Sequence, residues 1–63
     1  MKVSAALLIY CIPDPVNADG TAQDHIRSAD RLGLEVQEGF LVVTLDNTPV
    51  RLVPLAQVIW IEP

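Results

Sequence analysis

The first apolar stretch of the chain covers residues 3–13 and reads VSAALLIYCIP. Its aliphatic and aromatic residues, followed by Pro13 and Pro15, are typical of a β-strand. The stretch is too short for a transmembrane helix, which needs about 20 residues. Its other interpretation is a secretion signal that ends near Ala18, which would leave a short secreted chain without a disulfide. We therefore expect a strand in a cytoplasmic protein, with secretion as the alternative if residues 1–18 were a signal peptide.

A helix is expected over residues 22–32, after a loop rich in proline and turn residues at 13–20. The sequence TAQD at 21–24 resembles a capping box, and Gly33 follows where a helix typically ends. The apolar residues of this segment repeat at helical spacing, and they are Ala22, Ile26, Ala29 and Leu32. The other positions form a polar face with expected i,i+3 ion pairs, Asp24–Arg27 and Arg27–Asp30.

The second half of the chain alternates between β-forming stretches and turn residues. We expect strands at 34–37, 40–45, 50–53 and 58–62, with turns at 38–39 and 46–49 and a one-turn 3₁₀ corner at 54–57. The alternative is a single bent strand over 34–43, kinked at Gly39. The order strand, helix, strand, strand, strand predicts the α+β class, with one helix packed on a small antiparallel sheet or open barrel.

Several predicted strands are apolar on both faces, although an antiparallel sheet with one face in water normally alternates. In FLVVTL at 40–45, both sets of alternating positions are dominated by large apolar residues. One helix cannot cover the second face, so we expect another copy or a partner to cover it. A homodimer is the simplest such assembly. The candidate interface residues are Leu41, Val43, Leu45, Ile59, Ile61 and Trp60.

The composition limits the size and the stabilising chemistry of the domain. A length of 63 residues allows a single domain, near the size at which one core is marginally stable. With one cysteine and one histidine, the chain can form neither an internal disulfide nor a zinc site. Hydrophobic residues make up 51% and charged residues 19%, which favours oligomerisation. The net charge of −4 disfavours nucleic acid and anionic membranes as partners, and it permits a basic protein.

No arrangement of residues typical of a catalytic or cofactor site occurs in the sequence. His25 has no nucleophile near it, and Cys11 lies within a predicted strand, where thiols are usually inert. The glycines are isolated and form no phosphate loop. The sequence NADG at 17–20 resembles part of an EF-hand calcium loop, but Pro15 and Ile26 occupy its first and last ligand positions. We therefore expect no enzyme activity, no metal and no cofactor, with Cys11 as a small core residue.

The C-terminal residues 39–63, GFLVVTLDNTPVRLVPLAQVIWIEP, are similar to the last strands of Sm-like and SH3-like small β-barrels. In these barrels, too, a strand, a tight turn and a second strand precede a 3₁₀ corner and a final strand. The resemblance implies an open SH3-like barrel. It does not imply RNA binding, because this chain has no basic loop. In size, acidity and lack of catalytic groups, the chain is also similar to small phage-encoded proteins that bind and inhibit host proteins.

The leading functional hypothesis is a small non-enzymatic binding protein that self-associates and inhibits a protein partner. We expect the contact surface to consist of the polar helix face and the acidic loop, namely Asp24, Arg27, Asp30, Arg31, Asp14 and Asp19. One alternative is an oligomeric binder of small anions or nucleotides, which Arg27, Arg31 or Arg51 would grip. The other alternative is a structural or assembly subunit.

Overall fold

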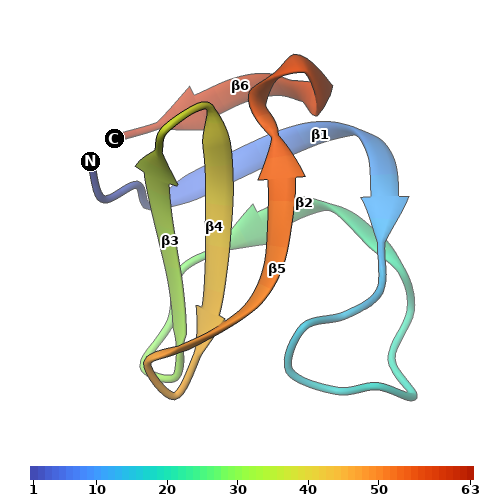
Figure 1. The fold of residues 1–63 in the computed structure, drawn as a ribbon. Coiled ribbons are helices and arrows are strands. Elements are labelled where there is room, and N and C mark those ends of the chain that lie inside the picture. Colours follow the sequence, from blue (N-terminus) through green and yellow to red (C-terminus); the bar gives the residue numbers. More distant parts are fainter.

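The computed structural model describes all 63 residues as six β-strands and one short 3₁₀ turn (Figure 1). The elements are β1 (Ala5–Ile12), β2 (Gln23–Arg27), β3 (Leu32–Gln37), β4 (Phe40–Leu45), β5 (Thr48–Pro54), η1 (Leu55–Gln57) and β6 (Val58–Glu62). Strands account for 60% of the residues and helical turns for 5%. The predicted α+β class is therefore wrong. None of the helical structure has the length and hydropathy needed to cross a bilayer.

The strands form two antiparallel sheets of three strands each, in the orders β2-β1-β6 and β3-β4-β5. β1 is central in the first sheet, because Ala5 pairs with Arg27 of β2 on one side and with Glu62 of β6 on the other. β3, β4 and β5 follow one another as antiparallel hairpins. Figure 1 shows the second sheet in front of β1 and β2, with the two chain ends close together.

The helix expected at 22–32 does not form, and strand β2 takes the place of its first half. Ile26 faces Ala6 of β1 and is completely buried, so strand pairing places the one large apolar side chain of QDHIR in the core. Leu32 is also buried, at the start of β3, whereas Ala22 and Ala29 are exposed. The residues that resemble a helix cap do not decide the structure here, because local helix propensity contributes less free energy than strand pairing and core packing.

The strand expected near the N-terminus is confirmed by β1, and the residues before it pair with β3. The amide of Val3 donates to the carbonyl of Leu34 at 3.0 Å. The amide of Val36 donates to the carbonyl of Met1 at 2.8 Å. The first residues of the chain therefore cover one edge of the second sheet and tie the two sheets together.

The two hairpins of the second sheet turn through pairs of residues with positive φ. Glu38 and Gly39, between β3 and β4, have φ angles of 49° and 87°. Asp46 and Asn47, between β4 and β5, have φ angles of 51° and 65°. Positive φ at both turn residues is the type I′ geometry, whose twist matches that of the flanking strands. Each hairpin therefore closes through two residues.

The expectations for strands in the second half are largely confirmed. β4 and β6 have the predicted bounds, β3 and β5 extend beyond theirs, and η1 forms the expected corner. The turn after β4 is shorter than the predicted 46–49, since β5 begins at Thr48. The alternative of one bent strand over 34–43 is wrong, because Gly39 is a turn residue.

One cluster of ten buried residues fills the space between the two sheets. It consists of Val3, Ala6, Leu8, Ile12, Ile26, Leu32, Leu34, Leu41, Val43 and Val53. Leu41 and Val43 are completely buried in this cluster. Their predicted place in a subunit interface is therefore wrong, because they face the core of their own chain.

Gly33 lies within β3, opposite Thr44 of β4, and does not end a helix. A Cβ atom at this position would lie 2.5 Å from Oγ1 of Thr44, closer than two such atoms approach in proteins. An alanine at position 33 therefore requires the Thr44 side chain to move.

We expect Gly33→Ala to lower the free energy of unfolding by about 1–3 kcal/mol, the usual range for overpacking. On a Thr44→Ala background the same substitution should be nearly neutral, because Oγ1 is gone and the Cβ of residue 44 lies 3.9 Å away. Urea denaturation of the four proteins measures the coupling between the two positions. Equal losses in the free energy of unfolding on both backgrounds would show that the contact with Oγ1 of Thr44 does not cause the destabilisation.

Candidate functional site

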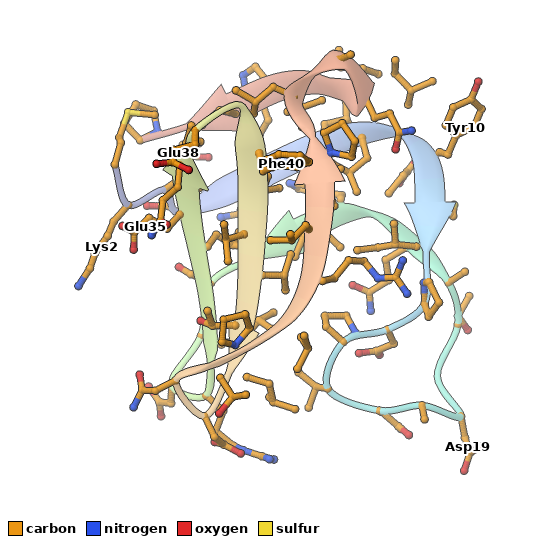
Figure 2. The ribbon with its side chains drawn as sticks, viewed as in Figure 1. Lys2, Tyr10, Asp19, Glu35, Glu38 and Phe40 are labelled. Carbon is orange, nitrogen blue, oxygen red and sulfur yellow. The ribbon has the colours of Figure 1, made fainter.

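The outer face of β4 and β5, turned away from the core, carries four apolar side chains. The ladder pairs Phe40 with Pro54 and Val42 with Leu52, and each pair shares this face. Phe40 is 39% exposed and Leu52 is 57% exposed, while Val42 between them is buried. Figure 2 shows Phe40 on the outer side of the sheet. We call these four residues the outer stripe.

The β3 side of the outer stripe is polar and acidic. Gln37 pairs with Phe40, and Glu35 pairs with Val42, so β3 adds one polar side chain to each row. Glu38 occupies the turn beside Phe40. Figure 2 shows both glutamates on this side of the sheet. Neither forms an ion pair within the chain, and Lys2 lies opposite Glu35 in the bridge between residue 2 and β3.

The outer face of the first sheet carries a second apolar surface, built around β1. Leu7 pairs with His25 of β2 and with Trp60 of β6, which places the three side chains in one row. The rings of His25 and Trp60 approach edge to face, with centroids 6.1 Å apart and planes at 62°. Trp60 is 44% exposed, and the neighbouring Ile59 is 62% exposed.

The polar contact surface that the sequence predicted does not exist as one surface. Asp24 and Arg27 stand three positions apart, which places them on one face of a helix but on opposite faces of strand β2. Asp30 lies in the connection from β2 to β3. The expected ion pairs of Arg27 with Asp24 and Asp30 are absent. The prediction of one polar helix face is therefore wrong.

The two loop aspartates of the predicted surface have different surroundings. Oδ1 of Asp14 accepts hydrogen bonds from the amides of Val16 and Asn17, at 2.9 and 3.1 Å. Its Oδ2 accepts one from Nε2 of Gln23 at 3.1 Å. Asp14 therefore shapes the loop that follows β1. Asp19 is exposed at the tip of this loop, well away from Phe40 (Figure 2).

Arg31 is the one arginine with an acidic partner. Its Nε and Nη2 donate to the two carboxylate oxygens of Asp46, at 3.0 and 2.8 Å. These hydrogen bonds, with the attraction of opposite charges, hold the pKa of the Asp46 carboxyl below its usual range and raise the pKa of Arg31. Both side chains are more than half exposed, so the pair contributes little to stability. Arg31 is therefore engaged by Asp46 within the chain, whereas Arg27 forms no ion pair.

Of the residues predicted for a subunit interface, only Ile59 and Trp60 are exposed. Leu45 and Ile61 are half-buried, and Ile61 packs against the core. Sequence reasoning missed the outer stripe, because a period of two separates the faces of a strand without showing which face is inside.

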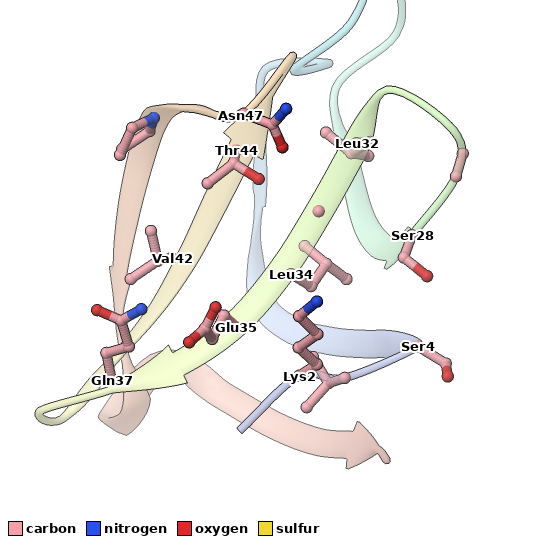
Figure 3. Close-up of a pocket in the computed structure, with 14 residues that line it drawn as sticks. Lys2, Ser4, Ser28, Leu32, Leu34, Glu35, Gln37, Val42, Thr44 and Asn47 are labelled. Carbon is pink, nitrogen blue, oxygen red and sulfur yellow. The ribbon is translucent and has the colours of Figure 1, made fainter.

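The largest hollow in the surface, of about 630 Å³, lies around β3 (Figure 3). Lys2 and Ser4 line it on one side of β3, and Glu35, Thr44 and Asn47 line it on the other. No arginine contributes to this lining. The three arginines considered for a small anion therefore do not converge in this hollow.

Cys11 and His25, the two residues with the most reactive side chains, are both exposed. The prediction that Cys11 belongs to the core is wrong, because the pairing of β1 with β2 is irregular between Leu7 and Ile12. No group of three or more His, Cys, Asp or Glu side chains is placed to hold a metal ion.

Comparison with known proteins gives no assignment for these surfaces. No protein-family model, curated protein or solved structure matches the chain.

We expect Arg31→Gln to raise the pKa of Asp46 towards the ordinary range of an aspartate, because the hydrogen bonds from the guanidinium to the charged carboxylate are lost. Arg27→Gln changes an arginine without an acidic partner and should leave that pKa unaltered. NMR titration of the Asp46 carboxyl carbon measures both. Because the folded-state pKa is lowered, the pair's small stabilisation is present above about pH 3.9 and is lost as the pH falls through the folded-state pKa. A low pKa that persists in Arg31→Gln would refute this cause.

Proposed function

We propose that this chain is a non-enzymatic protein-binding module that holds its partner against the outer stripe. The observation that supports the proposal is the exposure of Phe40 and Leu52 on neighbouring strands of a sheet whose other face is the core. Apolar surface in contact with water is unfavourable by about 25 cal/mol per Å². Exposed apolar residues that lie together beside a polar rim are typical of interaction sites.

The strands below the outer stripe make it a rigid surface. β4 is the central strand of its sheet and pairs with β3 on one side and β5 on the other. The opposite face of β4 carries Leu41 and Val43, which the core fixes in place. A partner that binds here orders few new side chains, and this lowers the entropic cost of association.

The charge beside the stripe favours a partner that presents apolar side chains together with lysine or arginine. Glu35 and Glu38 lie at the β3 side without ion partners, and the chain as a whole carries a net charge of −4. A second copy on this face would bring like charges together, whereas a basic protein would meet opposite charges. Such a module acts by occupying a surface of its partner and so inhibits other contacts there.

Selection of displayed peptides against the immobilised protein tests this function. We expect the selected peptides to combine apolar residues with lysine or arginine, and to bind less tightly at high salt. Phe40→Ser combined with Leu52→Ser should weaken their binding at least about tenfold, because both exposed anchors are removed. Ile9→Ser combined with Tyr10→Ser removes exposed apolar side chains of the first sheet and should leave the affinity unchanged.

Calorimetry gives the affinities, and NMR chemical-shift changes locate the bound peptide. The proposal fails if the peptides bind the Phe40/Leu52 double variant as tightly as the wild type. It also fails if the shift changes fall on the outer face of the first sheet.

A further inference from the structure

Each sheet has two edge strands, and an unpaired edge pairs with another chain unless something prevents it. The edge of β2 carries the charged and polar side chains of QDHIR. The edge strand β5 contains Pro49 and Pro54, which have no amide to donate. The edge of β3 is already paired with residues 1–3. Three of the four edges are therefore protected.

β6 is the edge that lacks such protection. It is the outer strand of the order β2-β1-β6 and pairs with β1 alone. Its sequence VIWIE contains no proline and no lysine, and its one charged residue, Glu62, is the last of the strand. Ile59 and Trp60 are exposed beside this edge. An apolar strand with a free edge favours the addition of another strand.

The backbone of β6 also directs unpaired hydrogen-bonding groups to this edge. The carbonyl of Glu62 accepts a hydrogen bond from the amide of Ser4 at 2.7 Å, so Glu62 faces β1. Neighbouring residues of a strand alternate in the side to which their amide and carbonyl point, so those of Ile61 point to the free edge. Ile59 has no partner on β1, because the register shifts at this residue.

We propose that two copies of this chain pair through their β6 strands, antiparallel and centred on Trp60. In this register Ile59 of one copy lies opposite Ile61 of the other, and the free backbone groups of these residues meet. Each Glu62 lies opposite Val58 of the other copy, so no like charges face each other. The strand is thus complementary to itself, which favours a second copy over an unrelated strand. This pairing uses a surface separate from the outer stripe and goes beyond the proposed function.

Sedimentation equilibrium of the full chain, from micromolar to near-millimolar concentration, tests the pairing. We expect the mass to rise from 6.9 kDa towards twice that value as the concentration increases. Ile59→Lys should keep the chain monomeric, because a lysine on an edge strand opposes pairing. Val50→Lys adds the same charge at an exposed position of β5 and should dimerise like the wild type. A wild-type chain that stays monomeric, or an Ile59→Lys chain that still dimerises, would overturn the proposal.

Disulfide trapping tests the register without relying on Ile59→Lys. On a Cys11→Ser background, Trp60→Cys places the thiols of the two copies opposite each other. Residue 60 of one copy and residue 60 of the other form a non-hydrogen-bonded pair, in which the Cα atoms lie about 4.5 Å apart. A disulfide spans about 4.4–6.8 Å between Cα atoms. We expect oxidation to link this variant at least about tenfold faster than Val50→Cys on the same background. Equal rates of linkage would overturn the proposed register.

Discussion

The structure depends on the ten side chains that pack between its two sheets, because the chain has no other core. Each sheet buries one face in this cluster, and none of the elements in residues 1–63 packs over the other face. The two ends of the chain are already in use, since residues 1–3 pair with β3 and β6 pairs with β1. A domain of this size buries only about 60% of its unfolded surface. Two apolar outer faces and one strand edge therefore stay in contact with water.

This constraint separates two kinds of apolar residue on the same strands. On β4, Leu41 and Val43 point inward and are completely buried, whereas Phe40 on the other face is exposed. The inner set holds the sheets together, and we propose that the outer set binds a basic partner. On β6, Ile61 packs against the core and Trp60 faces outward. In this proposal, the binding surfaces are the reverse sides of the strands that fold the chain.

Much of the strand pattern could be predicted from the sequence, because β-branched runs and turn residues are local signals. Local spacing could not show that the predicted helix at 22–32 is wrong. The strand there depends on the pairing of Ile26 with Ala6 of β1, which lies far away in the sequence. Gly33 follows a segment with helical spacing, but its role is the close contact with Thr44 across two strands. The sequence also could not show which face of FLVVTL lies in the core and which is exposed, because both faces are apolar. The resemblance to Sm-like and SH3-like barrels stays a prediction, since no solved structure matches the chain.

The claim that the inner face of the second sheet stabilises the fold and the outer face does not is tested most directly by the free energies of unfolding of Leu41→Ala and Leu52→Ala. Urea denaturation at one protein concentration measures both. We expect Leu41→Ala to lose about 2–5 kcal/mol, the usual cost of truncating a buried leucine. Leu52→Ala should change the value by no more than about 0.5 kcal/mol, as for an ordinary surface position. Losses of equal size for the two variants would contradict the division of β4 and β5 into a folding face and a binding face.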